Sequence, residues 1–194
     1  MTIWRTRAAT SCLALLGFIS LLSIPEPGSL VTDVMPAIPT QAPPQLFLPD
    51  DLGTLPLIYG DSFTPSVIAN QLKHGAVVLP LGYDFGEAGN VLVAAHSSGE
   101  ASFGSYRFAF GQLAELAVGE QFVVGAHGNR YTYQVYDTEI VWPHQIDHLP
   151  ATSRSTVTLV TCWPLWTDLQ RLLVHAELIS LKEERDLLPQ DARP

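Results

Sequence analysis

Short apolar runs broken by glycine and proline make up most of the chain after about residue 55. Several of these runs alternate polar and apolar residues, as in Thr156-Val157-Thr158-Leu159 at the start of the run that ends on Cys162, which is the period of a half-buried strand. A Gly128-Asn129 step between two of the runs is typical of a hairpin turn. The pattern predicts strands at Ala76–Pro80, Asn90–Ala95, Gln121–Ala126, Arg130–Trp142, Thr156–Cys162 and Arg171–Leu178.

Two segments have helical rather than strand character. Pro65–Leu72 follows Thr64, a residue type that caps helices, and has proline in its first turn. Phe108–Leu116 is the second predicted helix and ends before Val118-Gly119. Many short strands with few helices predict a mainly β protein, built either as a closed barrel or as a sandwich.

The first residues predict a membrane anchor at 1–24. Ala8 to Ile24 contains no charged residue, and its length is at the short end of a membrane span and also near that of a signal-peptide core. We find no small-x-small cleavage site, which favours an uncleaved anchor. Arg5 and Arg7 precede the apolar run and no acidic residue occurs before Glu26, so the positive-inside rule predicts a cytoplasmic N-terminus. The remaining chain is then extracytoplasmic, in a single-pass protein of the cell membrane.

The rest of the chain is predicted to divide into three parts. Residues 25–55 are rich in proline, which disfavours helices and central strands, and are expected to be an extended linker. Residues 56–180 carry the predicted strands and are the expected folded domain. Residues 181–194 are charged and end in proline, as in a frayed tail. At this length one domain with a well-developed core is expected.

Net charge narrows the range of partners. The chain has 10 basic and 19 acidic residues, and all the acidic ones lie after the apolar run. An acidic extracytoplasmic part argues against nucleic acid as a partner. It is compatible with basic peptide partners, although solubility accounts for it equally well.

Cys162 is the first candidate for chemistry. The only other cysteine is Cys12 in the apolar run, so Cys162 has no partner for an internal disulfide in the exported part. An unpaired thiol in such a domain indicates reactivity, and histidine is the usual base that activates it. His96 is the best-placed candidate because it ends the apolar strand Asn90–Ala95 and leads into Ser97-Ser98-Gly99.

These elements together resemble the sortase family, over roughly residues 55 to 180. The similarity lies in the order Gly89-Asn90-Val91, Ala95-His96-Ser97, Thr158-Leu159-Val160-Thr161-Cys162 and Arg171-Leu172-Leu173. Ala95 replaces the usual glycine before the histidine, and Glu120 replaces an aspartate that usually begins a later strand. The Cys162-Trp163-Pro164 sequence is more similar to classes D and E than to the housekeeping class.

The resemblance implies a fold and a reaction. The fold is a closed sortase-type β-barrel with about two short helices behind the membrane anchor, and residues 56–180 are its catalytic domain. The reaction is transpeptidation without a cofactor, in which Cys162 cleaves a Leu-Pro-x-Thr-Gly-like sorting signal after threonine and forms a thioacyl enzyme. His96 is the general acid and base, and Arg171 binds the substrate backbone and the oxyanion. The acceptor is an amine, either of a cell-wall precursor peptide or of a pilin lysine. The alternative is a sortase-fold module that binds or scaffolds without turnover.

Two further residues are candidates for substrate binding. Thr161 is expected to contribute its amide or hydroxyl near the oxyanion, and Trp163 is either a wall of the substrate groove or a core aromatic, as is Trp166. His144 and His148 have the spacing of helical metal ligands, but Pro143 and Pro150 flank them and favour a loop, so no metal site is predicted.

Overall fold

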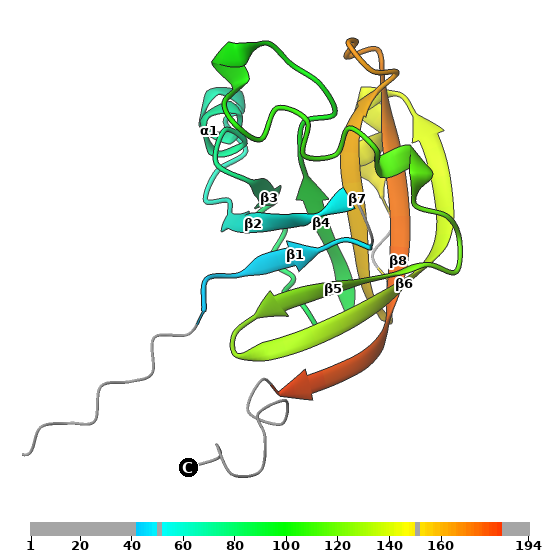
Figure 1. Ribbon diagram of the computed structural model, residues 1–194. Helices are drawn as coiled ribbons and strands as arrows, with labels where there is room; N and C mark the ends of the chain where they lie inside the picture. The colour runs from blue at the N-terminus through cyan, green and yellow to red at the C-terminus, as the bar shows by residue number, and fades with distance from the viewer. Residues whose placement is uncertain (1–41, 50–51, 150–151, 184–194) are drawn as a thin grey trace, which may run out of the picture. The chain divides into compact units, whose positions relative to one another are not determined.

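The computed structural model describes residues 42–49, 52–149 and 152–183. These residues form a closed eight-stranded barrel in the order β1-β2-β3-β4-β7-β8-β6-β5 (Figure 1). The strands are β1 Gln45–Phe47, β2 Thr54–Tyr59, β3 Ala76–Val78, β4 Gly89–Ala94, β5 Gln121–Ala126, β6 Asn129–Val141, β7 Ser155–Trp163 and β8 Gln170–Glu183. The pairs β2–β3 and β4–β7 are parallel, and the other neighbours are antiparallel. The mainly β closed barrel is therefore confirmed, and the sandwich alternative is not.

All six predicted strands are present, and two more were missed. β1 and β2 begin inside the range expected to be a linker, so that expectation is wrong from Gln45 onward. Leu46 and Leu55 are buried in the barrel, and β1 pairs with both β2 and β5. Strand pairing with distant segments therefore overcomes the local effect of the surrounding prolines. The predicted tail also begins later than residue 181, because β8 continues to Glu183.

One of the two predicted helices forms. α1 spans Pro65–Gln71 with Thr64 at its N-cap, although the Thr64 side chain makes no capping hydrogen bond. The predicted helix at Phe108–Leu116 is wrong, because only the short 3₁₀ turn η3, Leu113–Glu115, forms within it. The Phe110 amide donates instead to the His96 carbonyl at 2.8 Å. A Cβ at Gly111 would lie 3.0 Å from the Ser97 carbonyl oxygen, so the segment packs closely against the chain that follows β4.

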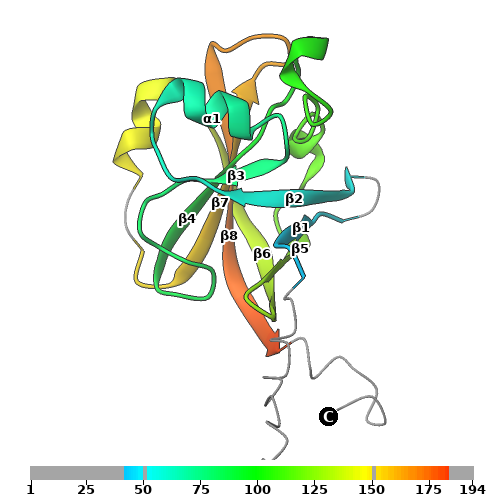
Figure 2. The same cartoon turned by 90° about the vertical axis from the view of Figure 1, so that its left-hand side faces the viewer.

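Two apolar clusters lie on opposite faces of the sheet formed by β4, β7 and β8. The larger fills the barrel interior and includes Leu159 and Val174. The smaller consists of Leu92, Val141, Val160 and Leu173, and it lies on the outer face because side chains alternate along a strand. Ile146 of the 3₁₀ helix η4, Pro143–His148, packs against this outer cluster, and Figure 2 shows η4 beside β4 and β7. η2, Ala101–Phe103, follows β4.

The expected membrane anchor, most of the linker and the tail beyond Glu183 lie outside the described residues. Within the described residues, no helix combines the length and the apolar character needed to cross a membrane.

Candidate active site

Cys162 and Arg171 occupy directly opposed positions on neighbouring strands. In the antiparallel β7–β8 ladder the Cα of Cys162 is paired with that of Arg171. Directly opposed residues project to the same face, with Cβ atoms about 5 Å apart. Both lie two residues beyond the outer cluster pair Val160 and Leu173, so the thiol and the guanidinium share the outer face of the barrel. The predicted nucleophile and the predicted cation are therefore neighbours by register alone.

His96 reaches the same place from the other side of β7. β4 runs parallel to β7 with Ala94 opposite Val160, and the Ala95 amide donates to the Val160 carbonyl at 3.1 Å. Because the strands are parallel, the residues two positions after this pair, His96 and Cys162, lie side by side. The His96 ring is half-buried and lies against Phe103, with ring centroids 4.8 Å apart. The arrangement of β4, β7 and β8 thus gathers all three predicted catalytic residues at one end of the barrel.

A pocket of about 690 Å³ contains both Cys162 and His96. It lies between two loops, one after β4 and one between β7 and β8, which project from the same end of the barrel in Figures 1 and 2. Its lining is His96, Ser98, Gly99, Glu100, Phe103, Cys162, Trp166, Thr167 and Asp168. The two loops are joined across the pocket, because the Trp166 amide donates to Ser98 Oγ at 2.7 Å. A thiol, an imidazole and a volume suited to a peptide therefore occur together.

Burial sets the ionisation of both groups. It raises the pKa of the Cys162 thiol, an effect that Arg171 opposes and Asp168 reinforces. Burial also lowers the pKa of His96. At neutral pH the resting pair is therefore mostly a neutral thiol and a neutral imidazole. Such a pair can form a reactive thiolate and an imidazolium in a minor fraction of molecules, or by proton transfer when substrate binds.

A sequence model described as the sortase domain matches residues 57–179. The chain belongs to the sortase family. Among solved structures it is similar to sortase C-3 of Streptococcus pneumoniae, with 27% identity, a TM-score of 0.59 and coverage of 74% of this chain and 65% of that one. For sortase C-1 of Actinomyces oris the identity is 25%, the TM-score 0.58 and the coverage 71% and 73%. This chain therefore spans just under two thirds of the pneumococcal protein.

Sortase A of Listeria monocytogenes shares the fold at 19% identity, with a TM-score of 0.59 and coverage of 76% of this chain and 91% of that one. No curated protein sequence matched this chain. Because solved sortases of classes A, C and D all resemble this barrel, the expected likeness to classes D and E stays a prediction.

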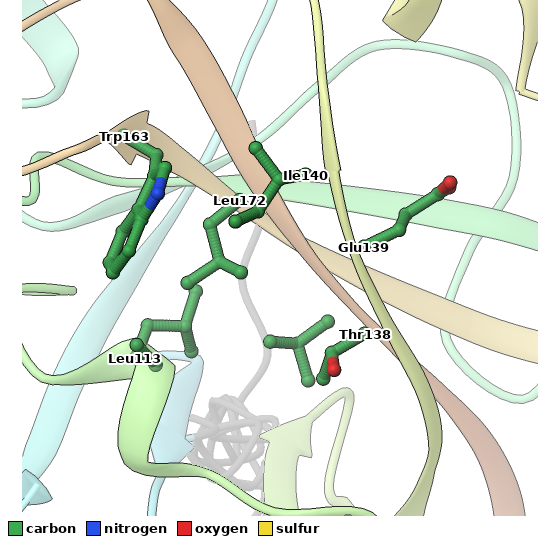
Figure 3. Close-up of a pocket in the computed structure, with 8 residues that line it drawn as sticks. Leu113, Thr138, Glu139, Ile140, Trp163 and Leu172 are labelled. Atoms are coloured by element: carbon green, nitrogen blue, oxygen red, sulfur yellow. The ribbon is translucent and has the colours of Figure 1, made fainter.

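Trp163 lies on the other side of the sheet from the thiol. It packs against the interior cluster and lines a second pocket of about 330 Å³ with Leu113, Leu172 and Glu139 (Figure 3). The core alternative for Trp163 is therefore the one that the structure supports, and its contact with substrate stays a prediction. Trp166 does line the active-site pocket. Alternation along β7 explains the difference, because Cys162 and Trp163 must face opposite ways.

Thr161 is a structural neighbour of the site. Its side chain is buried and its hydroxyl donates to the Ala95 carbonyl at 2.7 Å. That hydrogen bond holds the residue before His96 against the residue before Cys162. Since the hydroxyl is used in this way, the predicted contribution of the Thr161 hydroxyl to an oxyanion site is not supported, and the hydrogen bond instead holds together the two segments that carry Cys162 and His96.

Arg171 is held by the end of the β7–β8 loop. Its Nη1 donates to the carbonyl oxygens of Asp168 and Gln170, both at 2.9 Å. An arginine has five N–H donors in a planar fork, so these two bonds fix the plane and leave Nε and Nη2 as donors. The sortase therefore presents an oriented fork beside the thiol.

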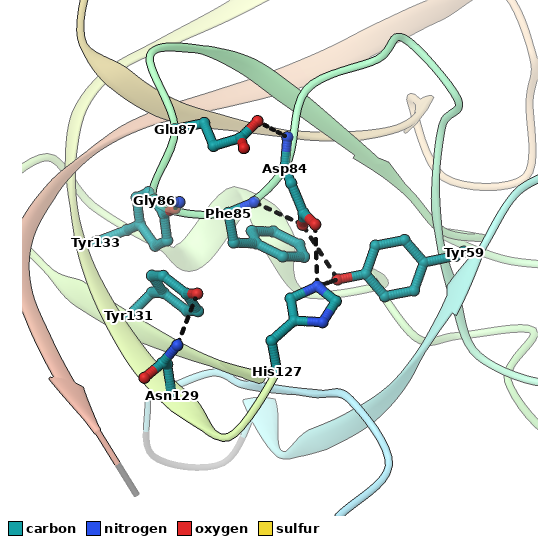
Figure 4. Close-up of polar contacts among 9 residues, drawn as sticks. All are labelled: Tyr59, Asp84, Phe85, Gly86, Glu87, His127, Asn129, Tyr131 and Tyr133. Carbon is teal, nitrogen blue, oxygen red and sulfur yellow. Dashed lines mark hydrogen bonds and ion pairs between the residues drawn. The ribbon is translucent and has the colours of Figure 1, made fainter. Parts of the chain in front are cut away.

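Other histidines have partners away from this pocket. His127, in the β5–β6 hairpin, lies 2.8 Å from the Tyr59 hydroxyl and 3.0 Å from an Asp84 carboxylate oxygen (Figure 4). His175 lies between the Thr158 hydroxyl and Glu139. Each of these contacts joins separate segments of the barrel. Within the described residues, no group of three or more histidine, cysteine or acidic side chains is arranged to hold a metal ion.

The directions of the two pKa shifts predict an unusual pH dependence. Alkylation of Cys162 by uncharged iodoacetamide follows the thiolate, so its rate should rise with pH with a midpoint above the ordinary thiol pKa. Turnover of a donor peptide should follow a bell whose acid limb lies below the ordinary histidine pKa. An alkylation midpoint at or below neutral pH would show instead a resting thiolate–imidazolium pair.

Proposed function

We propose that this sortase is a cysteine transpeptidase that cleaves a Leu-Pro-x-Thr-Gly-like sorting signal after threonine and transfers it to an amine. The observation that carries the proposal is the presence of Cys162 and His96 in one pocket, with Arg171 opposite the cysteine. Membership of the sortase family supports the same reaction class. The acceptor is a cell-wall precursor peptide or a pilin lysine, which would anchor surface proteins or build pili.

Each residue then has a defined task in two half-reactions. The Cys162 sulfur attacks the threonine carbonyl carbon, and His96 gives a proton to the departing glycine nitrogen as the peptide bond breaks. The product of this step is a thioester between Cys162 and the donor. The acceptor amine attacks that thioester, the carbon–sulfur bond breaks, and His96 returns the amine proton to the sulfur. The remaining donors of Arg171 stabilise the charge on the carbonyl oxygen in both steps.

A mechanism-based label tests the proposal directly. A Leu-Pro-x-Thr peptide ending in an aldehyde or a vinyl sulfone should modify Cys162 stoichiometrically, as seen by intact mass and by sequencing of the labelled peptide. The same warhead on a scrambled peptide should react at least about tenfold more slowly. Equal rates for both peptides would mean a reactive thiol without the proposed recognition, and no reaction would favour a binding module.

We also propose that the protein is a single-pass protein of the cell membrane, with residues 1–24 as its anchor and the barrel outside the cytoplasm. The charge distribution around the apolar segment supports this topology. A reporter that is active only outside the cytoplasm should give signal when fused after Pro194. Removal of residues 1–25 should release an active barrel into the soluble fraction, and retention of that truncated protein in membranes would contradict the anchor.

A further inference from the structure

The active-site pocket extends beyond the thiol and the imidazole into the space between the two loops. Glu100 lies on the loop after β4 and Asp168 on the loop between β7 and β8, so a carboxylate stands on each side. No lysine or arginine is among the residues that line this pocket. Arg171 lies at the thiol end, opposite Cys162, so the space between the two loops is the acidic part of the pocket, and it favours a cationic ligand over a neutral or anionic one.

Neither carboxylate has a structural partner among the described residues. Other acidic side chains near the sheet are paired, for example Glu177 with Arg154 and Glu139 with His175. In contrast, the side chains of Glu100 and Asp168 make no hydrogen bond or ion pair within the described part of the chain. The loop positions are nevertheless held, since Arg171 binds the Asp168 carbonyl and Ser98 binds the Trp166 amide.

Asp168 is unfavourable for the first half-reaction and harmless in the second. Its negative charge raises the pKa of Cys162, which disfavours the thiolate that attacks the donor. Once the sulfur is in a thioester it carries no ionisable proton, and that penalty disappears. Asp168 lines the same pocket as Glu100, so after acylation its charge faces the molecule that binds next, which is the acceptor.

We propose that Glu100 and Asp168 form the recognition site for the acceptor and select a cationic primary amine that carries no carboxylate near its reactive nitrogen. The inference rests on the proposed transpeptidase function. It also states where the amine approaches Cys162, namely from the space between the two loops. The exposed rings of Phe103 and Trp166 line the same space and offer an apolar surface to the carbon chain of the acceptor. The carboxylates thus concentrate the ammonium form next to His96.

The chemical step balances without any further reactant. The ammonium releases one proton to solvent, and the neutral amine nitrogen then forms a bond to the thioester carbonyl carbon. The carbon–sulfur bond breaks, and the second proton passes from nitrogen through His96 to the sulfur. The products are an amide and the free Cys162 thiol. Because the amine must lose a proton before it attacks, the carboxylates aid capture and orientation rather than nucleophilicity.

The test compares acceptors that differ only in charge. A quenched Leu-Pro-Glu-Thr-Gly donor is supplied with triglycine amide or with triglycine, and separately with Nα-acetyl-lysine amide or Nα-acetyl-lysine. Ligation of each acceptor is measured by mass spectrometry relative to donor hydrolysis. The wild-type protein should prefer the amide of each pair, and the preference should weaken at high salt. The pair that ligates faster identifies a peptide N-terminus or a lysine side chain as the natural amine.

Variants assign that preference to the two carboxylates. Asp168→Asn and Glu100→Gln should each reduce the preference for the amide about fivefold, the effect of one charge pair near the surface. Donor hydrolysis should rise in Asp168→Asn, because the thiol ionises more readily. Glu115→Gln removes an equal charge from a position outside this pocket and should leave the preference as in wild type.

Two outcomes would overturn the inference. The first is a wild-type preference for the amide that persists when Glu100→Gln and Asp168→Asn are combined in one protein. The second is a fall in donor hydrolysis that equals the fall in ligation, which would place the carboxylates on the donor. If the wild-type protein does not cleave the donor at all, the proposed function fails and the acceptor site fails with it. If the donor is cleaved but the carboxylate variants keep the wild-type acceptor preference, only the acceptor site is rejected.

Discussion

Cys162→Ala should abolish transpeptidation, with a loss on the order of 10⁴-fold or more, and His96→Ala should cause a loss of similar size. The sulfur forms the covalent intermediate, and the imidazole moves a proton in both half-reactions, so neither group can act without the other. The double variant should therefore be no slower than the slower single variant. Ligation of a Leu-Pro-Glu-Thr-Gly donor to triglycine amide, followed by mass spectrometry, measures all three.

The structure also says what these variants should retain. Cys162 is half-buried at the end of β7 and the change to alanine removes one atom, so the barrel should keep its unfolding temperature and bind donor peptide. Cys12→Ala is the matched control and should leave activity unchanged. Near wild-type turnover in either single variant, or losses that simply multiply in the double variant, would contradict the thiol–imidazole mechanism.

The barrel topology explains how residues far apart in the sequence meet. β7 lies between β4 and β8, with β4 parallel to it and β8 antiparallel. The C-terminal end of β4, the C-terminal end of β7 and the N-terminal end of β8 are therefore at the same edge. His96 follows the first, Cys162 lies near the second and Arg171 lies near the third. Strand pairing alone therefore brings a histidine, a cysteine and an arginine to one edge of the barrel.

Much of this arrangement could be predicted from the sequence, because it depends on strongly patterned segments. Alternation and short apolar runs located six of the strands, the unpaired thiol and the strand-ending histidine pointed to Cys162 and His96, and the resemblance to the sortase family added Arg171. β1 and β2 could not be found in this way. They lie among prolines, and their pairing with each other and with β5 is decided by distant parts of the chain.

Other features depend on contacts that local pattern does not reveal. The failed helix at Phe108–Leu116 has helix-compatible residues, but the hydrogen bond from Phe110 to the His96 carbonyl favours a turn. Trp163 follows Cys162 directly in β7, and adjacent side chains of a strand point to opposite faces. The predicted strand was therefore sufficient to place Trp163 on the face opposite Cys162. Glu100 and Asp168 lie on loops whose approach to each other follows from the Ser98–Trp166 hydrogen bond. A polar loop directly after His96 was the available signal for that pocket wall.

Arg171→Lys should reduce kcat/KM for the donor on the order of 10²-fold, although the positive charge is kept. Two donors of the guanidinium are engaged by the Asp168 and Gln170 carbonyls, which orient the remaining donors beside Cys162. A lysine carries a single rotatable ammonium and cannot bind both carbonyls and also direct a fixed pair of N–H groups at the substrate. The matched control is Arg154→Lys, an exposed arginine paired with Glu177, which should stay near wild type.

A second measurement separates geometry from charge. Arg171 lowers the pKa of Cys162 through its charge, so the lysine variant should keep the wild-type pH profile for alkylation by iodoacetamide while it loses turnover. An alkylation midpoint that rises together with the loss would mean that Arg171 acts on the thiol itself. If kcat/KM of the lysine variant stays within about threefold of wild type, a difference well under 1 kcal/mol, charge alone is sufficient and the fork has no directional role.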